Sequence, residues 1–262
     1  MSISTFSVKN LEKDNYKKYG KLKNKFFHDY QIYWHDILNS TMDIVNKNIS
    51  NRENLNHIIV SNFQKKGHGR FKRKWYSKKN KNLLVSIPII VDNDLSARMP
   101  IILSLSMFET VKEFVSDSSK LKIKWPNDIL LNSRKISGMI TENVIQGKKV
   151  YINFGVGINI NLEKKELLDK NFLATSLFIE ESEIFSLKEV LYVLLGKISN
   201  NLNYEKKLFE YWKKNLYFPK DKIRLNNKEE YDLKDVDDFG NLVVQRQDET
   251  LKISFGEISF HD

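Results

Sequence analysis

Residues 124–138 read Lys124-Trp125-Pro126-Asn127-Asp128-Ile129-Leu130-Leu131-Asn132-Ser133-Arg134-Lys135-Ile136-Ser137-Gly138. A lysine at the start of an apolar strand, with Gly138 nearby, would place an ammonium group beside a bound acyl carbonyl. There it would stabilise the charge that develops on carbonyl and phosphate oxygens as an acyl-adenylate forms or breaks. Asp128 lies in a tight turn and could orient an incoming amine or a metal. Taken alone, the segment is equally typical of an ordinary turn.

A second segment is basic and rich in glycine, and reads Gln64-Lys65-Lys66-Gly67-His68-Gly69-Arg70-Phe71-Lys72-Arg73-Lys74-Trp75. Its two glycines let the backbone approach a ligand closely and leave amide groups free to bind anions. Arg70 and Arg73 are permanently charged, forked donors that suit phosphate or carboxylate oxygens. Bringing a carboxylate against a triphosphate crowds negative charges, and cations on one loop would relieve this. Alternatively, the segment is an exposed basic loop or a nucleic-acid patch with interleaved aromatic residues.

A third segment alternates glycine with apolar residues and reads Phe154-Gly155-Val156-Gly157-Ile158-Asn159-Ile160-Asn161. Alternate glycines on a strand leave a smooth surface on which a flat ring or chain can lie. Asn159 could read an adenine edge or close a turn. The glycine spacing excludes a dinucleotide fingerprint, and a P-loop is absent.

Composition narrows the class of protein. The 262 residues, 41% of them hydrophobic, suffice for one large domain or for one domain with a small appendage. The absence of cysteine excludes disulfides, thiolate metal sites and a catalytic thiol. No apolar run approaches the length of a membrane span, and the first residues lack the apolar region of a secretory signal. We therefore expect a cytoplasmic protein with no membrane partner.

The net charge of +10 is unevenly distributed. Residues 64–81 hold nine lysines and arginines and no acidic residue, whereas residues 217–262 are net acidic. A short basic segment of this kind indicates a local anionic ligand, such as a nucleotide phosphate, more than a nucleic-acid coat.

The apolar pattern predicts three parts. Residues 1–27 are polar and rich in lysine, which is typical of a solvated or loosely attached extension, and an organellar leader is the alternative. Residues 28–216 are expected to form an α/β main domain. Beyond a boundary near Pro219, residues 217–262 read as the short strands of a small β-barrel.

Helices and strands are expected at specific positions. Strands are predicted at 57–63, 82–91 with an interruption at Pro88, 121–125, 129–131, 136–144 and, with one buried face, 150–156. Helices are predicted at 41–45, at 97–115 as an amphipathic helix, and over the long region 187–216. The C-terminal strands are predicted at 222–225, 242–245 and 251–260.

The three segments, taken together and in this order, resemble the biotin–protein ligase family, in its monofunctional form without an N-terminal DNA-binding domain. The resemblance covers roughly residues 33–262. The most specific element is Lys124–Asp128 followed by Lys135-Ile136-x-Gly138 and Glu142. The supporting matches are Ser40-Thr41, the glycine–arginine loop 64–75, Asn82-Leu83 with Ser86, the glycine-rich strand 155–161, and Ala174-Thr175-Ser176-Leu177.

This resemblance implies a fold and an activity. The fold would be an α/β domain similar to class II aminoacyl-tRNA synthetases, followed by a small SH3-like β-barrel. The enzyme would form biotinyl-5′-AMP from biotin and ATP with Mg²⁺, and would transfer biotin to a lysine of a biotin carboxyl carrier domain of a biotin-dependent carboxylase. We expect no DNA partner, because only about thirty residues precede the first motif. Some members of the family form homodimers through the main sheet, and a homodimer stays open here.

The resemblance also implies residue roles. Lys135, Arg70 and Asp128 would be catalytic. Biotin would be bound by Ser40, Thr41, Gln64, Gly67, His68, Gly69, Arg70, Lys135 and Gly138, and ATP by Arg70, Arg73, Trp75, Asn127, Lys135 and Asn159. No protein ligand of a metal is predicted.

Three positions depart from the family pattern. His68 replaces the first arginine of the loop, Lys72 stands where a glycine is usual, and Met42 replaces a frequent asparagine. A fixed charge is therefore lost at position 68. The nearest rival is a lipoate ligase or transferase, which has a related fold and a different acyl group. The other rivals are a basic nucleic-acid-binding module and a structural protein with a degenerate site, and the presence of both Lys135 and Arg70 argues against the latter.

Overall fold

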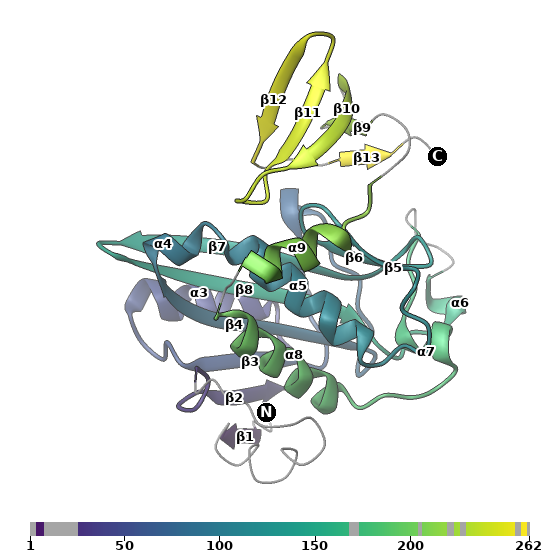
Figure 1. Cartoon of the computed structure of the whole chain (residues 1–262). Coiled ribbons are helices and arrows are strands. Elements are labelled where there is room, and N and C mark those ends of the chain that lie inside the picture. Colours follow the sequence, from purple (N-terminus) through teal and green to yellow (C-terminus); the bar gives the residue numbers. More distant parts are fainter. Residues whose placement is uncertain are drawn as a thin grey trace.

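The computed structural model describes residues 4–7, 26–167, 173–203, 206–218, 223–225, 229–254 and 258–260. Its main body is an eight-stranded sheet in the order β1-β2-β3-β4-β8-β7-β6-β5, shown in Figure 1. The strands are β1 (Ser4–Ser7), β2 (Gln31–His35), β3 (His57–Ser61), β4 (Asn82–Asp92), β5 (Leu121–Lys124), β6 (Asp128–Leu131), β7 (Arg134–Gln146) and β8 (Lys149–Asn159). Neighbouring strands are antiparallel except β2 and β3.

Helices cover both faces of this sheet (Figure 1). On one face, α3 (Thr41–Asn51) packs on β3, β4 and β8. On the other face lie α5 (Met99–Lys112), α8 (Leu187–Asn201) and α9 (Lys206–Lys214). Shorter helical segments are η1 (Arg70–Lys72), α4 (Asn93–Ser96), α6 (Lys164–Leu167) and α7 (Leu177–Glu181). In the part of the chain that the structure describes, no helix is both long and apolar enough to cross a membrane.

The central strands are buried on both faces, which corrects the prediction of a single buried face for residues 150–156. From Val150 onward β8 contains no exposed residue. Because α3 and the loop 64–75 cover the face that would otherwise meet solvent, even Asn153 is fully buried, and its side chain donates to the Met42 carbonyl and to Asn46 Oδ1.

Helix α5 is buried almost all round, so the predicted amphipathic helix at 97–115 is also corrected. It lies between the sheet and helices α8 and α9, and it therefore has no broad face left for solvent. Its polar side chains are satisfied within the helix: Ser106 donates to the Ile102 carbonyl and Thr110 to the Ser106 carbonyl, each at 2.7 Å. Such back-bonding lets serine and threonine sit in a buried helix.

Several predicted boundaries also change. Strand β4 continues through Pro88, which pairs with Asn153 of β8. Pairing of β4 with β3 extends only over Leu84–Ser86, so Pro88 has a strand on one side only, the position that proline tolerates. The helix predicted at 41–45 extends to Asn51, and the region 187–216 forms two helices, α8 and α9, rather than one.

The two ends of the chain differ from their predictions in part. Residues 4–7 of the predicted loose extension form β1 and pair with β2, while residues 8–25 lie outside the described residues. The C-terminal strands are β9 (Ile223–Leu225), β10 (Glu229–Val236), β11 (Leu242–Arg246), β12 (Glu249–Ile253) and β13 (Ile258–Phe260), in the order β12-β11-β10-β9-β13. Thus β10 was missed, and 251–260 is two strands. Among the described residues β12 does not pair with β13, so the sheet is not a closed barrel. Pro219 also lies outside the described residues.

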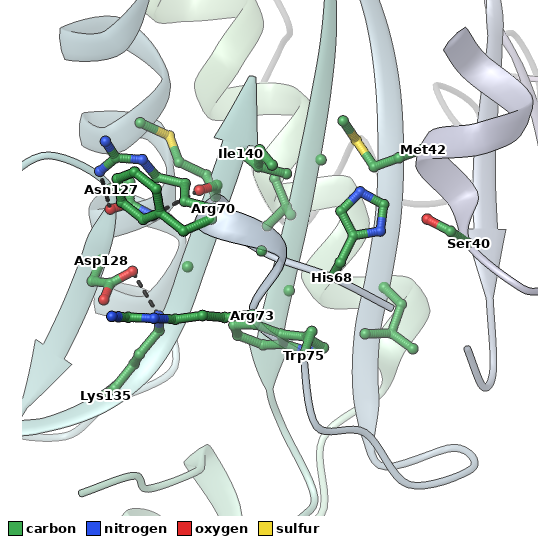
Figure 2. Close-up of a pocket in the computed structure, with 18 of the residues that line it drawn as sticks. Ser40, Met42, His68, Arg70, Arg73, Trp75, Asn127, Asp128, Lys135 and Ile140 are labelled. Atoms are coloured by element: carbon green, nitrogen blue, oxygen red, sulfur yellow. Dashed lines mark hydrogen bonds and ion pairs between the residues drawn. The ribbon is translucent and has the colours of Figure 1, made fainter. Parts of the chain in front are cut away.

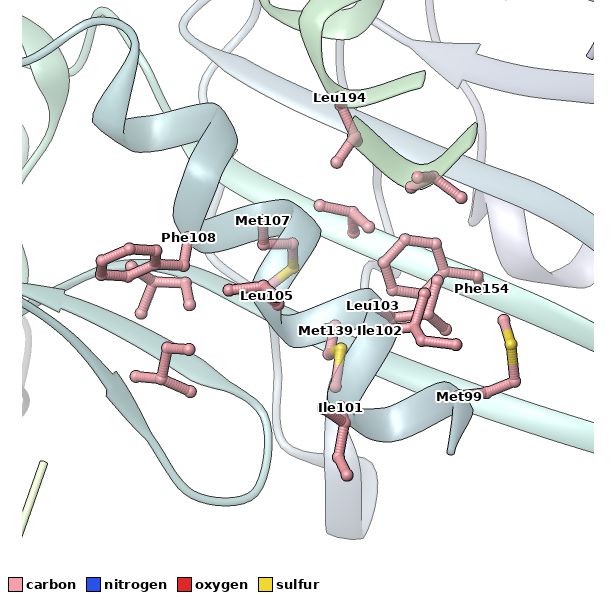
Figure 3. Close-up of a cluster of buried hydrophobic side chains, with 14 of the residues drawn as sticks. Met99, Ile101, Ile102, Leu103, Leu105, Met107, Phe108, Met139, Phe154 and Leu194 are labelled. Atoms are coloured by element: carbon pink, nitrogen blue, oxygen red, sulfur yellow. The ribbon is translucent and has the colours of Figure 1, made fainter. Parts of the chain in front are cut away.

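The hydrophobic core lies between the sheet and α5 and α8, and Figure 3 shows Phe154 of β8 at its centre beside Leu103. Phe154 has no exposed surface.

We expect Phe154→Ala to lower the free energy of unfolding by about 3–5 kcal/mol, because it removes buried surface and leaves a cavity. Urea denaturation measures this change. The matched control is Phe71→Ala, at a ring that is 58% exposed, with an expected change within about 0.5 kcal/mol. Equal losses in the two variants would contradict this placement of the core.

Candidate functional site

A cavity of about 130 Å³ opens on the face of the sheet that carries α3. Its floor is formed by β4, β7 and β8, and it lies between the start of α3, the loop 64–75 and the turn 125–128 (Figure 2). The lining residues are Ser40, Thr41, Met42, Gln64, His68, Gly69, Arg70, Phe71, Arg73, Trp75, Leu84, Val85, Lys124, Trp125, Pro126, Asn127, Asp128, Lys135, Gly138, Met139, Ile140, Gly155, Val156 and Gly157.

The floor depends on glycine at two positions of β8. Gly155 and Gly157 pair with Ile140 and Gly138 of β7. A Cβ atom on Gly155 would lie 2.4 Å from the sulfur of Met42, and one on Gly157 would lie 2.4 Å from the Trp75 ring. Contacts that short do not occur in real structures, so any side chain at either position would displace its neighbour. Glycine therefore lets α3 and the Trp75 ring lie directly on the strand.

The loop 64–75 is a tight hairpin that turns back over the cavity. The Gly69 N–H donates to the Arg73 carbonyl at 2.7 Å, and the Trp75 N–H donates to the Gly67 carbonyl at 2.9 Å. At its tip Phe71 has a positive φ of 54° and an exposed ring. This reversal directs Arg70 back toward the floor, where its Nη1 donates to Asn127 Oδ1 at 3.3 Å.

One end of the cavity is polar and uncharged. The Thr41 N–H, in the first turn of α3, donates to Gln64 Oε1 at 2.6 Å, and the Thr41 and Ser86 hydroxyl oxygens are 2.7 Å apart. Ser40 is almost completely buried beside them, and its side chain makes no cap hydrogen bond. This end therefore offers hydroxyl and amide groups for a neutral ligand with donors and acceptors of its own.

The opposite end is charged (Figure 2). Lys135 Nζ lies 2.7 Å from Asp128 Oδ1 in a partly buried ion pair, and 5.4 Å from the centroid of the Trp75 ring. Gly138 makes room for this pair, because a Cβ there would lie 3.0 Å from both Asp128 Oδ1 and Lys135 Nζ. Asn127 is held by donating to the Met139 carbonyl at 2.9 Å. An anion bound here would meet two cationic groups, from Lys135 and Arg70.

The structure brings together most of the residues predicted for the site. The predicted residues that line the cavity are Ser40, Thr41, Gln64, His68, Gly69, Arg70, Arg73, Trp75, Asn127, Asp128, Lys135 and Gly138. Two predicted residues do not line it. Gly67 lies against the Gln64 side chain, and a Cβ there would be 2.9 Å from Gln64 Nε2. Asn159 is buried, donates to the Thr175 carbonyl and accepts from Asn82 Nδ2, both at 2.9 Å. Its contact with ATP stays a prediction.

His68 lies on the side of the cavity where Ser40 and Met42 are found, away from Arg70 and Asp128 (Figure 2). Its Nδ1 is 3.4 Å from the Lys66 carbonyl oxygen. The side chain at this position therefore faces the polar end of the cavity.

Some lining residues were missed. The alternating glycines at Gly155 and Gly157 predict a smooth strand, and this alternation is the sequence signal that points to their place in the floor of the cavity. Met42 was noted only as a departure, and Met139 and Ile140 carry no signal beyond their place in an apolar strand. Among the residues that the structure describes, no three histidine or acidic side chains gather as a metal-binding group.

Comparisons with known proteins agree with this arrangement. Residues 34–159 match the model of the biotin/lipoate A/B protein ligase family. Biotin–protein ligase 2 of Arabidopsis thaliana is 34% identical over 139 residues, which are 51% of this chain and 41% of that protein. The bifunctional ligase/repressor BirA of Bacillus subtilis is 29% identical over 160 residues, 60% of this chain and 48% of that protein. The chain thus spans less than half the length of these two relatives.

Solved structures match a larger share of the chain. The biotin protein ligase from Aquifex aeolicus in complex with biotin and ATP superposes with a TM-score of 0.68 at 24% identity, over 87% of this chain and 97% of that one. The Leishmania major enzyme in complex with biotinyl-5-AMP gives a TM-score of 0.57 at 20% identity, over 86% and 98%. The predicted α/β fold is confirmed by these likenesses. The chain therefore carries, over residues 34–159, a domain of the biotin/lipoate A/B protein ligase family.

Proposed function

We propose that this chain is an ATP-dependent biotin–protein ligase that makes biotinyl-5′-AMP and transfers biotin to a lysine of a biotin carboxyl carrier domain. The observation that carries the proposal is the two-ended cavity. Its uncharged end, at Ser40, Thr41 and Gln64, suits the ureido ring of biotin. Its cationic end, at Arg70 and Lys135, suits a carboxylate against a phosphate.

In the first half-reaction a biotin carboxylate oxygen attacks the α-phosphorus of ATP, and the bond to the β-phosphate oxygen breaks to release pyrophosphate. Lys135 and Arg70 offset the negative charge that gathers as the two anions meet. A free carboxylate or phosphate would compete with Asp128 for the Lys135 ammonium, whose Nζ lies 2.7 Å from Asp128 Oδ1. Lys135 would therefore exchange Asp128 for the substrate as its ionic partner.

In the second half-reaction the acceptor amine attacks the acyl carbon, the bond to AMP breaks, and the amine gives up a proton. Asp128, once released from Lys135, is the carboxylate at the cavity available to orient that amine. The hairpin 64–75 lies over the floor and shields the adenylate from water. Trp75, whose buried indole N–H has no hydrogen-bond partner among the described residues, is assigned to the adenine side.

The proposal includes Mg²⁺ with ATP. Asp128 is the one acidic residue among the described residues that line the cavity, and it is paired with Lys135. With this single, paired carboxylate at the cavity, the Mg²⁺ ion would be bound chiefly by the triphosphate, and it would neutralise phosphate charge there. We assign no protein residue as its ligand.

The proposed partner is a carrier domain and not DNA, since both arginines of the loop, Arg70 and Arg73, line the cavity. A homodimer and a cytoplasmic location, or an organellar one if residues 1–27 belong to a leader, are part of the same proposal.

In the deciding experiment the chain is incubated with biotin, ATP, Mg²⁺ and a carrier domain, and the mass of the acceptor is then measured by mass spectrometry. We expect a biotin-sized increment on one lysine. Omitting ATP is the control. In biotin-dependent ATP–pyrophosphate exchange, lipoate should not compete. Exchange driven by lipoate rather than biotin would favour the lipoate ligase alternative.

Arg70→Gly is expected to loosen the adenylate, because it removes a fixed cation from the carboxylate and phosphate. Biotinyl-AMP should then leave the site and label lysines of bystander proteins, which streptavidin blotting detects. The matched control is Arg52→Gly, at an exposed residue with a positive φ of 57° that glycine adopts readily. Adenylate retention equal to that of the unmodified chain would exclude this role for Arg70.

Gly157→Ala is expected to raise the KM for ATP by about tenfold or more, since a contact of 2.4 Å must push the Trp75 ring off the floor. Biotin affinity, set at the other end of the cavity, should change little. The control is Gly147→Ala, in the β7–β8 turn, where the positive φ costs stability but no atom lies within 4 Å of the new Cβ. An unchanged KM in Gly157→Ala would show that Trp75 does not bind the nucleotide.

A further inference from the structure

Lys135 lies where the main sheet gives it little support. Strand β8 begins to pair with β7 only at Ser137. Strand β6 pairs with β7 on both sides of a register shift, with Leu130 opposite Lys135 and Ile129 opposite Ser137. Such a bulge re-aims side chains but leaves the ladder locally broken. The backbone of Lys135 therefore needs another support.

That support is the segment 173–175. The Lys135 N–H donates to the Leu173 carbonyl at 3.0 Å, and the Lys135 carbonyl accepts from the Thr175 N–H at 2.9 Å. This parallel bridge holds both backbone groups of Lys135. The direction of the Lys135 side chain thus depends on where Thr175 and its neighbours are held.

A single carboxylate, Glu180 of α7, ties this segment to the β6–β7 turn. Glu180 Oε1 accepts from the Thr175 hydroxyl and, at 2.8 Å, from Arg134 Nη2, while Oε2 accepts from Asn132 Nδ2 at 2.6 Å. Its side chain is only 8% exposed. Asn132 and Ser133 form the turn with φ values of 51° and 60°, so the turn is tight and Arg134 follows it directly.

The position of Glu180 is fixed in its turn by the start of α7. The Ser176 hydroxyl accepts from the Ile179 N–H at 3.1 Å and donates to the Leu162 carbonyl at 2.6 Å, which anchors the helix to the segment that follows β8. The carboxylate therefore holds Arg134, which precedes Lys135 in the chain, and Thr175, which bonds to the Lys135 carbonyl. Arg134 and Thr175, the two residues through which Lys135 is held, therefore both bond to the nearly buried Glu180 carboxylate.

We propose that Glu180 is a positioning residue that directs the Lys135 ammonium toward Asp128 and the cavity, acting through Arg134 and Thr175. The placement of Lys135 follows from the contacts alone. Its catalytic consequence rests on the proposed function. Glu180 lies outside the lining of the cavity and is not expected to touch either substrate.

The first test does not depend on activity. Trace labelling with acetic anhydride, followed by peptide mass spectrometry, compares Lys135 with exposed Lys165 as an internal standard. In Glu180→Ala the relative labelling of Lys135 should rise by about tenfold, which corresponds to about 1.4 kcal/mol of lost restraint. The matched control, Glu183→Ala, removes the same charge from an exposed site and should leave the ratio unchanged. An unchanged ratio in Glu180→Ala overturns the proposal.

The second test uses biotin-dependent ATP–pyrophosphate exchange. Glu180→Ala should lower kcat by about tenfold and leave the KM for ATP within about twofold, because an interaction with the reacting atoms is lost while substrate binding is kept. In the double variant Glu180→Ala/Lys135→Ala, the rate should equal that of Lys135→Ala alone. Losses that multiply would show that Glu180 acts on the fold in general, and would overturn the proposal.

A third variant guards against misfolding. Thr175→Val removes one of the donors to Glu180 with little change in volume, and it should reproduce part of both effects. If the Lys135 labelling ratio and the exchange rate of Thr175→Val both equal those of the unmodified chain, the route through Thr175 is contradicted. If the unmodified chain shows no exchange, the proposed function fails, while the labelling ratio still decides whether Glu180 places Lys135.

Discussion

The arrangement of the site depends on the register of the β4–β8–β7 ladder. Gly157 is paired with Leu84 on one side and Gly138 on the other, and Gly155 is paired with Ser86 and Ile140. A shift of one residue would turn every side chain to the opposite face. Phe154 and Ile158 would then point at the ligand loop, and the glycines would open holes in the core. The same register thus builds the core on one face and leaves a bare floor on the other.

The bare floor explains why the charged groups can approach a ligand from above and from one end. The Trp75 ring lies directly against Gly157, and the Lys135 ammonium lies 5.4 Å from the centre of that ring, so the floor, the ring and the ammonium are neighbours. Arg70 reaches the same end from the hairpin and meets Asn127. The two arginines of the basic segment, Arg70 and Arg73, therefore line the cavity, where they can meet a small anionic ligand.

Residue identities predicted the site better than they predicted the secondary structure. Lys124–Asp128, Lys135 and the glycine–arginine loop could be found because their chemistry is written in local sequence. The burial of α5 could not be predicted from the sequence, because it depends on which elements pack against the far side of the helix. The same holds for β8, whose second face is buried by α3. Strand β10 was missed because its sequence, Glu229–Val236, is mostly charged and matches no apolar alternation.

Asn159 belongs to a buried hydrogen-bond network beside the site. Its place in the glycine-rich strand predicts a contact with the nucleotide, and its side-chain Oδ1 and Nδ2 atoms bond inside the protein to Asn82 and to the Thr175 carbonyl. Asn82 in turn accepts from the Lys78 N–H, just beyond the ligand loop. A buried chain of hydrogen bonds therefore runs from the end of that loop to Thr175, which holds Lys135. Through this chain Asn159 helps to fix the position of Thr175, whose N–H group bonds to the Lys135 carbonyl.

Trp125 extends this argument to the C-terminal sheet. It belongs to the most specific segment of the sequence, and its nearly buried indole donates to the Gly240 carbonyl at 2.9 Å, in the β10–β11 turn. That turn is closed by Asp237, whose carboxylate accepts from the N–H groups of Phe239 and Asn241 at 3.0 Å each. Since only Pro126 separates Trp125 from Asn127 and Asp128, the contact with Gly240 helps to fix the turn that meets Arg70 and Lys135. The small sheet is thus a physical part of the site's support, although its side chains do not line the cavity among the described residues.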